Sequence, residues 1–259
     1  MTQNSKGTTP NFRPKFFVGT HLLPSVHRFN RCMISINRLE HRKGDIYPND
    51  WILDSRAFTR LESGKGHMPV EAYAGQIKRW AKCGNLVAAV SQDFMCEPFI
   101  LDITGMTVKD HQDQTIGRYR RLMAIRPRDV YIMPVLQGFE PEDYRQHIDM
   151  YGDLLETGAW VGVGSVCKRN STPNSVAEVL ETIIIERPDL RLHAFGLKKT
   201  ALKFERVSGL LESCDSMAWS FAARRQGRDP NDWREALQYT DDINNAPRQR
   251  DMFVGGITK

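Results

Sequence analysis

Three aspartates at the ends of apolar runs are the residues of this sequence best suited to chemistry. Asp54 and Asp93 each end such a run, and Asp215 follows Cys214 in the last of them. Carboxylates buried close together acquire different proton affinities, so one can act as nucleophile while another acts as acid or base. A single acid in such a place more often caps a helix or anchors a loop. Three of them predict an active site, provided that the fold brings these ends together.

The apolar runs have the length and composition of strands buried on both faces. They hold few charged residues, and each is followed by polar or helical sequence, which is typical of a parallel sheet. The runs expected to form strands are Phe16 to Gly19, Cys32 to Ile36, Trp51 to Asp54, Leu86 to Asp93, Val130 to Gln137, Trp160 to Val166, Leu190 to Gly196 and Cys214 to Ser220.

Stretches with helical periodicity separate these runs. Pro69 and Pro141 precede acidic residues, as at the first turn of a helix. The expected helices cover Pro69 to Cys83, Gln114 to Arg126, Pro141 to Thr157, Ser175 to Glu186 and Ala201 to Leu211, with a terminal helix after Arg228. The alternation favours the α/β class and a (β/α)8 TIM barrel, with a doubly wound open sheet as the alternative. The first three strands follow one another closely, so the helices between them must be short.

Length and composition fit one soluble domain. The chain has 259 residues, of which 41% are hydrophobic, and we expect a flexible segment over residues 1–14 followed by a barrel over 15–259. No run approaches the roughly 18 apolar residues of a membrane span, and the N-terminus carries no signal peptide, so a cytoplasmic location is expected. The net charge of +5 favours a polyanionic partner.

The polar segments at the strand ends resemble, in order, the motifs of the tRNA-guanine transglycosylases. Trp51 to Phe58 resembles the family's Asp-Ser-Gly-Gly-aromatic segment, and Ser91 to Pro98 resembles Phe-Asp-Glu-Cys-Thr-Pro. The later matches are Pro134 to Gly138 with Val-Gln-Gly, Val161 to Ser165 with Gly-Gly-Leu, His193 to Leu197 with Leu-Phe-Gly, and Cys214 to Arg224 with the archaeal Phe-Asp-Ser segment. One such match arises by chance in many proteins, whereas six in order are specific.

The resemblance implies a base exchange on a nucleic acid. Asp215 would be the nucleophile that attacks C1′ and forms a covalent glycosyl ester, and Asp54 would be the general acid and base. The aromatic rings of Phe58 and Phe195 would enclose the purine, whose polar edges need hydrogen-bond partners. The implied base-binding residues are Ser55, Phe58, Asp93, Gln137, Gly138, Gly162, Val163, Gly164, Phe195 and Gly196.

The choice of polymer follows from departures from the tRNA enzymes. Those enzymes carry a Cys-x-Cys-x-x-Cys plus His zinc site after the nucleophile segment, whereas no cysteine follows Cys214 here. We therefore expect neither that zinc-binding subdomain nor any cofactor. The short chain and the segments Phe17 to His21 and Asp215 to Trp219 resemble the DpdA branch, which inserts 7-deazaguanines into the DNA of phages and bacteria. That resemblance implies 7-cyano-7-deazaguanine (preQ0) as incoming base, and a bacterial or phage-infected cell as location.

Binding DNA would require the target nucleotide to be flipped or single-stranded. Basic pairs expected after the strands could hold its backbone: Lys168, Arg169, Lys198, Lys199, Arg224 and Arg225. The alternatives are a tRNA-guanine transglycosylase without the zinc site and a non-catalytic nucleic-acid-binding barrel. The oligomeric state and the roles of His21 and His111 do not follow from the sequence.

Overall fold

Every strand of the sheet runs parallel to its neighbours. The computed structural model describes residues 13–169, 172–247 and 249. Its strands are β1 (Lys15–Gly19), β2 (Arg31–Ser35), β3 (Asp50–Asp54), β4 (Asn85–Val90), β5 (Ile132–Met133), β6 (Val135–Leu136), β7 (Trp160–Val163), β8 (Arg191–Ala194) and β9 (Leu211–Ser216). They are ordered β5-β4-β3-β2-β1-β9-β8-β7-β6.

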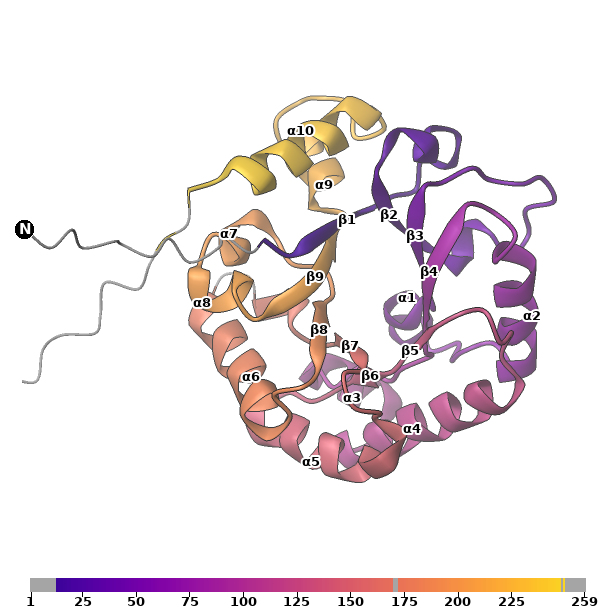
Figure 1. Ribbon diagram of the computed structural model, residues 1–259, viewed down its shortest axis with the longest axis vertical. Coiled ribbons are helices and arrows are strands. Elements are labelled where there is room, and N and C mark those ends of the chain that lie inside the picture. Colours follow the sequence, from indigo (N-terminus) through magenta and orange to yellow (C-terminus); the bar gives the residue numbers. More distant parts are fainter. Residues whose placement is uncertain (1–12, 170–171, 248, 250–259) are drawn as a thin grey trace, which may run out of the picture.

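Pro134 divides one expected strand, Val130 to Gln137, into β5 and β6. Proline has no backbone N–H and cannot donate to the ladder, so the strand is interrupted there. Pro134 still accepts a hydrogen bond from the Gly162 N–H at 2.8 Å. Because β5 pairs with β4 and β6 pairs with β7, this segment joins the two ends of the sheet and closes it (Figure 1). The predicted (β/α)8 barrel is confirmed.

Strand alternation divides the apolar side chains into two cores. Successive residues of a strand face opposite sides of the sheet. One cluster, which includes Phe17, Met33 and Ile52, fills the barrel lumen, and a larger cluster packs between the strands and the helices. On β9, Cys214 belongs to the outer core, so Ser213 and Asp215 on either side of it face the lumen.

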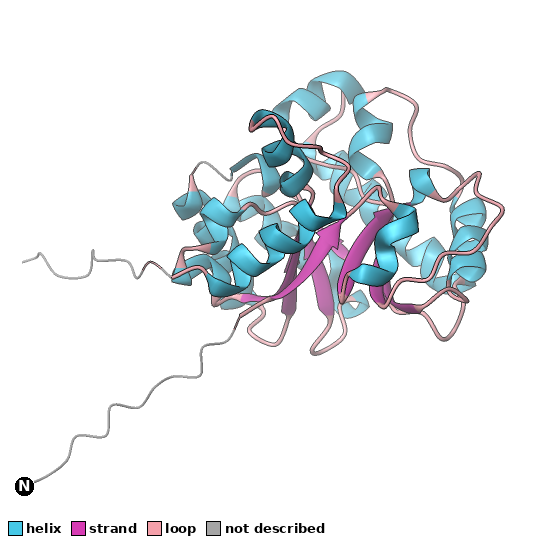
Figure 2. Ribbon diagram, turned by 90° about the horizontal axis from the view of Figure 1, so that it is seen from above, coloured by secondary structure: helices cyan, strands magenta, loops and turns pink. Residues whose placement is uncertain are grey.

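Helices surround the strands on the outside (Figure 2). They are α1 (Ala57–Glu62), α2 (Val70–Trp80), α3 (Pro98–Thr104), α4 (Val108–Ile125), α5 (Pro141–Tyr151), α6 (Pro173–Glu186), α7 (Lys199–Leu202), α8 (Glu205–Ser208), α9 (Ala218–Arg225) and α10 (Trp233–Asn245). The first three strands are linked only by the 3-10 helices η1 (Leu23–Arg28) and η2 (Ile36–Arg38), as their close spacing predicts, and η3 (Gly152–Leu154) and η4 (Cys167–Arg169) are equally short.

Local chemistry explains where the element boundaries differ from expectation. α4 begins six residues before Gln114, because Thr107 and Asp110 form a reciprocal capping box. The helix expected over Ala201 to Leu211 is split into α7 and α8 by an extended residue, Phe204, and Leu211 already belongs to β9. The last strand likewise ends at Ser216, before α9.

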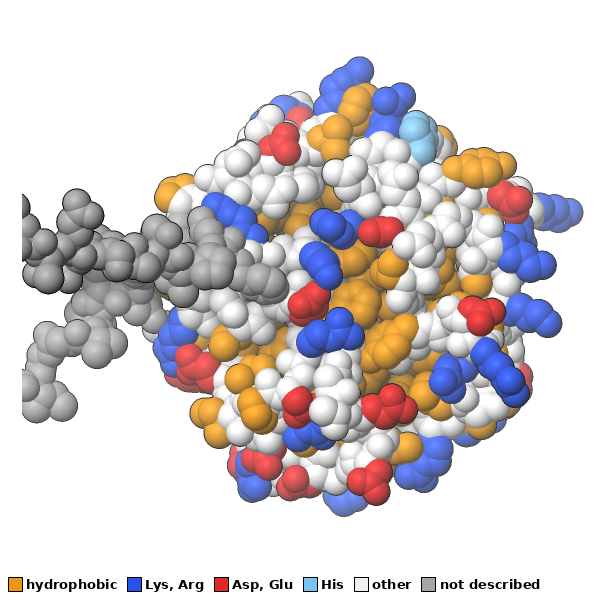
Figure 3. Space-filling view, in the orientation of Figure 1, with side chains coloured by type: hydrophobic (Ala, Val, Ile, Leu, Met, Phe, Trp, Pro, Cys, Tyr) orange, Lys and Arg blue, Asp and Glu red, His pale blue; other side chains and the backbone are white. Residues whose placement is uncertain are grey.

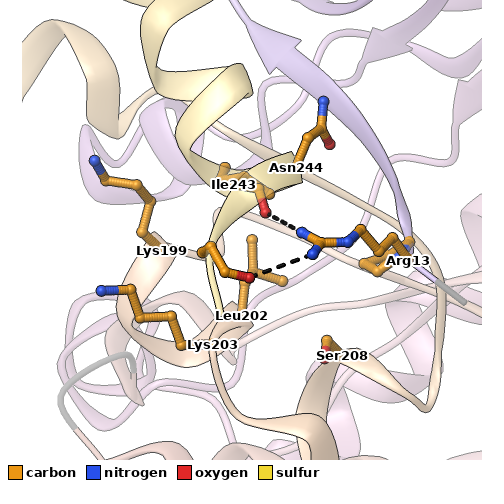
Figure 4. Close-up of a pocket in the computed structure, with 9 residues that line it drawn as sticks. Arg13, Lys199, Leu202, Lys203, Ser208, Ile243 and Asn244 are labelled. Carbon is orange, nitrogen blue, oxygen red and sulfur yellow. Dashed lines mark hydrogen bonds between the residues drawn. The ribbon is translucent and has the colours of Figure 1, made fainter. Parts of the chain in front are cut away.

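The residues just before β1 are hydrogen-bonded to the end of the last helix, α10. The Arg13 guanidinium donates to the backbone oxygens of Ile243 at 2.9 Å and Ala246 at 3.3 Å, at the end of α10 (Figure 4). Of the segment expected to be flexible, residues 1–12 lie outside the described residues, and Arg13 is held by these bonds. No helix within the described ranges is long and apolar enough to cross a membrane.

Candidate active site

A cavity of about 410 Å³ lies at the carboxyl ends of the strands. Residues at or just after the ends of β1, β2, β3, β4, β6, β7, β8 and β9 line it, so the whole barrel contributes to one site. This is the end of a TIM barrel at which active sites form. Its volume is within the range of small-molecule pockets.

The three aspartates singled out in the sequence all line this cavity. Asp54 ends β3, Asp93 follows β4 and Asp215 lies in β9. Burial raises the pKa of Asp54, which the negative charge of Asp215 raises further, while hydrogen bonds from the Ser35 hydroxyl and the Arg56 backbone oppose the shift. The pair therefore shares one electrostatic environment, in which Asp54 retains a proton more readily than an ordinary aspartate.

Asp93 lies in a buried polar network. Burial raises the pKa of Asp93 to about 7, against a lowering effect of the Gln137 amide, which donates to Asp93 Oδ2. The Ser165 hydroxyl lies 2.8 Å from Gln137 Oε1, and the backbone N–H of Gln137 donates to Nδ1 of His147 at 2.9 Å. Gln137 is thus fixed at three points, with its amide between Asp93 and Ser165.

Asp215 is held through one of its two oxygens. The backbone N–H of Gly196 donates to Oδ1 at 3.0 Å, and Nε2 of the buried His193 lies 3.5 Å from the same oxygen. Gly196 adopts φ +65°, a left-handed conformation that favours glycine. Within the described residues, no hydrogen bond reaches Oδ2. The carboxylate is therefore fixed in orientation and keeps one oxygen for chemistry.

The two aromatic rings singled out in the sequence both line the cavity. Phe195 follows β8 and packs over Gly162, where an added Cβ would lie 2.4 Å from Cζ of the ring. Phe58, at the start of α1, contacts Phe99 edge-on with centroids 6.4 Å apart. The close approach at Gly162 explains the absence of a side chain at that position of β7.

The other residues expected to bind the base divide into two groups. Gln137, Gly164 and Gly196 line the cavity together with Asp93 and the two phenylalanines. Four residues do not line it: Ser55, Gly138, Gly162 and Val163. The Val163 side chain packs in the outer core, and the Ser55 hydroxyl donates to Asp93 Oδ1 at 3.4 Å.

Of the six basic residues expected to hold the backbone, the five whose side chains the structure describes do not line the cavity. Lys199 forms an ion pair with Asp242 at 2.6 Å, and the Arg169 guanidinium lies over the ring of Phe139. The exposed side chains are Lys198, Arg224 and Arg225, while the Lys168 side chain lies outside what the structure describes. On the face in Figure 3, Lys and Arg side chains are interspersed with Asp and Glu, so charge alone marks no single surface there.

The cavity contains polar residues that the sequence did not single out. Asn37 and Arg38 follow β2, and Arg38 is exposed. His21, whose role the sequence left open, also lines the cavity and stacks on Trp219 with centroids 5.7 Å apart. The sequence could have indicated these residues as part of the site, because all of them lie just after predicted strands.

His111 is a structural residue in the first turn of α4, packed against the loop after β4. Its Nδ1 lies 2.6 Å from the Met95 backbone oxygen, and its Nε2 lies 2.8 Å from the Thr104 hydroxyl. Both ring nitrogens are engaged, so His111 braces the loop that carries Asp93.

No group of three or more His, Cys, Asp or Glu side chains suited to a metal ion occurs within residues 13–169, 172–247 and 249. Burial raises the pKa of the Cys32 thiol to about 12 and also raises the pKa values of Cys96 and Cys214. Burial thus favours the protonated thiol over the thiolate that a metal requires.

Residues 12–255 match the family model described as DpdA, DeoxyPurine in DNA protein A. The match covers nearly the whole chain and contains every residue that lines the cavity. A search of curated proteins finds no match.

Proposed function

The chain belongs to the DpdA family of DNA-modifying transglycosylases, and we propose that it exchanges guanine in DNA for a 7-deazaguanine through a covalent intermediate on Asp215. The observation that carries the proposal is the convergence of Asp54, Asp93 and Asp215 on one cavity. Two of these acids have raised pKa values, and the third has a fixed carboxylate whose second oxygen accepts no hydrogen bond from the part of the chain that the structure describes.

In the first half-reaction, Asp215 Oδ2 attacks C1′ of the target deoxyguanosine. The C1′–N9 bond breaks, its electron pair goes to the leaving guanine, and protonated Asp54 supplies the proton that neutralises that base. Burial of Asp54, which raises its pKa, favours this starting state. The product is an ester between Asp215 and the deoxyribose.

In the second half-reaction, the incoming 7-deazaguanine loses its N9 proton to the Asp54 carboxylate. Its N9 then bonds to C1′ as the ester bond breaks and returns the electron pair to Asp215. Asp54 ends protonated, as it began, so the cycle needs no further proton donor. We propose 7-cyano-7-deazaguanine as the incoming base.

The base would lie between Phe58 and Phe195, with its polar edge against Asp93 and Gln137. All four side chains line the cavity. Because the pKa of Asp93 is about 7, its carboxyl group can either donate or accept a hydrogen bond near neutral pH, which suits a contact with the polar edge of a purine. Since a base stacked in a duplex could not reach Asp215, the target nucleotide must be extrahelical.

The proposal is tested by incubating the protein with labelled guanine or 7-cyano-7-deazaguanine and either DNA or tRNA. We expect incorporation into DNA, and a protein–DNA adduct that survives denaturation when incoming base is withheld. Asp215→Asn should abolish both. Asp242→Asn, a matched change at a surface acid paired with Lys199, should retain them.

Each other outcome rejects the proposal in a specific way. Incorporation into tRNA alone would indicate a tRNA enzyme without the usual zinc site. Binding of DNA with no exchange on either polymer would indicate a non-catalytic barrel. Full exchange by Asp215→Asn would remove the nucleophile assignment.

A further inference from the structure

A chain of polar groups, which begins at the half-buried Trp160, crosses the barrel lumen and ends at Asp215. The indole Nε1–H of Trp160 donates to Ser213 Oγ at 2.9 Å, and Ser213 Oγ lies 2.9 Å from Nδ1 of His193. His193 is fully buried and packs edge-on against the rings of Phe17, Trp160 and Phe195. An imidazole enclosed by aromatic rings has little freedom to turn.

This chain of bonds fixes the tautomer of His193. An indole nitrogen can only donate, so Ser213 Oγ must accept from Trp160. The Ser213 hydroxyl hydrogen then has His193 Nδ1 as its acceptor, since no other acceptor for it lies within the described residues. With Nδ1 as acceptor, the neutral ring carries its proton on Nε2. The opposite tautomer would leave the hydroxyl hydrogen without an acceptor.

The Nε2–H of His193 has no hydrogen-bond partner of ordinary length within the described residues. Its neighbour is Oδ1 of Asp215 at 3.5 Å, an oxygen that already accepts from Gly196. A buried donor without a hydrogen-bond partner lowers the stability of the folded protein, so such a group in a native structure usually has a functional reason. Catalytic hydrogen bonds are often long in the unliganded state and shorten as charge develops.

We propose that His193 is a positioning residue that stabilises the Asp215 carboxylate as it leaves the glycosyl ester. The inference rests on the proposed function, in which Asp215 carries the sugar. In the ester the carboxyl group is neutral, so a hydrogen bond from His193 to Oδ1 would stabilise it only weakly. As the Oδ2–C1′ bond breaks, its electron pair moves onto the carboxylate and the Nε2–H of His193 approaches Oδ1. No proton is transferred.

The same geometry separates the two oxygens of the nucleophile. Oδ1 faces the donors of Gly196 and His193, whereas Oδ2 accepts no hydrogen bond from the described residues. Oδ2 is therefore the atom that bonds to C1′. When the ester bond breaks, negative charge develops on the carboxylate, and the donors at Oδ1 stabilise it. A donor aimed at developing charge acts on the step in which that charge appears.

The experiment compares His193→Gln with His193→Asn. Glutamine places an amide N–H about as far from the backbone as Nε2, whereas asparagine reaches only the position of Nδ1. The measurement is the guanine concentration that releases half of the DNA from the preformed adduct. Loss of the hydrogen bond from His193 destabilises the free Asp215 carboxylate relative to the neutral ester. His193→Asn should therefore need about tenfold more guanine than wild type to release half of the DNA. His193→Gln should remain within about threefold.

Ser213→Ala keeps the imidazole and removes only the hydroxyl that fixes the tautomer. It should raise the same guanine concentration by less than His193→Asn does, and it serves as the test if the asparagine variant fails to fold. Equal release by wild type, His193→Asn and Ser213→Ala would overturn the role of His193. Absence of any adduct in wild type would instead reject the proposed nucleophile, so the two failures are distinguishable.

Discussion

The backbone N–H of Gly196 lies 3.0 Å from Oδ1 of Asp215, and Gly196 holds φ at +65° in making this bond. Any other residue is strained there by about 1–2 kcal/mol, and an added Cβ would lie 2.9 Å from Cβ of Cys167. We expect Gly196→Ala to lower both stability and base exchange, the latter by at least about tenfold, because a misplaced nucleophile loses its alignment. Exchange rates and urea unfolding measure the two effects.

Gly227 provides the control for backbone strain. It has φ +70°, and no atom of the described residues lies within 4 Å of an added Cβ. Gly227→Ala should lose stability by a similar amount, about 1 kcal/mol, and keep wild-type exchange. Equal loss of exchange in both variants would mean that strain, not the bond to Asp215, limits the reaction.

The raised pKa of Asp93 predicts a specific pH dependence of stability. The folded protein holds this proton up to a pH of about 7, whereas the unfolded chain releases it near the ordinary value of 3.8. The folded state therefore binds more protons over this range, and stability falls by roughly 1.4 kcal/mol per pH unit as pH rises from 4 to 7. Asp93→Asn removes this contribution, so its free energy of unfolding should increase relative to wild type between pH 5 and pH 8. If the difference in free energy of unfolding between Asp93→Asn and wild type did not change with pH, the raised pKa of Asp93 would be contradicted.

His147 predicts the opposite slope on the acid side. Burial lowers the pKa of His147 to about 3, below its usual value of 6.5. The unfolded chain takes up this proton first, so stability falls as pH decreases from 6.5 toward 3, by roughly 1.4 kcal/mol per unit. His147→Asn can still accept from the Gln137 N–H but does not titrate. Its stability deficit against wild type should shrink between pH 7 and pH 5 in urea unfolding.

Arg38 should contribute to DNA binding, whereas Lys199 should not. Arg38 lines the cavity and is exposed, while Lys199 is paired with Asp242 and lies over Tyr239. We expect Arg38→Ala to weaken binding of DNA of any sequence and to reduce the slope of log K against log salt by about 1. Lys199→Ala should leave that slope unchanged. Fluorescence anisotropy at several salt concentrations distinguishes the two variants.

Most of the fold could be predicted because it depends on local patterns. Each buried strand has an apolar run, and each expected strand matches one strand of the barrel or, around Pro134, two. Element ends were less predictable, since they depend on individual side chains. The capping box of Thr107 with Asp110 starts α4 early, and the extended Phe204 divides α7 from α8.

The site could be predicted where a residue follows a strand within a known motif. Asp54, Asp93 and Asp215 met that condition and line the same cavity. Arg38 follows β2, but no motif drew attention to it. Contacts across the barrel were out of reach for another reason: Ser213 and His193 lie on different strands, and their register includes an irregularity between Leu192 and His193. Sequence spacing does not specify such a shift.

The hydroxyl, imidazole and indole N–H in the lumen also limit how stable this barrel is. When both partners of a buried hydrogen bond are replaced by apolar groups of similar shape, the change is often neutral or stabilising. A barrel with Trp160→Phe, Ser213→Ala and His193→Phe would therefore keep its architecture and the Gly196 N–H bond to Asp215, while losing the imidazole N–H beside that carboxylate. We therefore expect this triple variant to melt at a higher temperature than wild type and to exchange bases more slowly, which would place a cost in thermal stability on the polar groups that position Asp215.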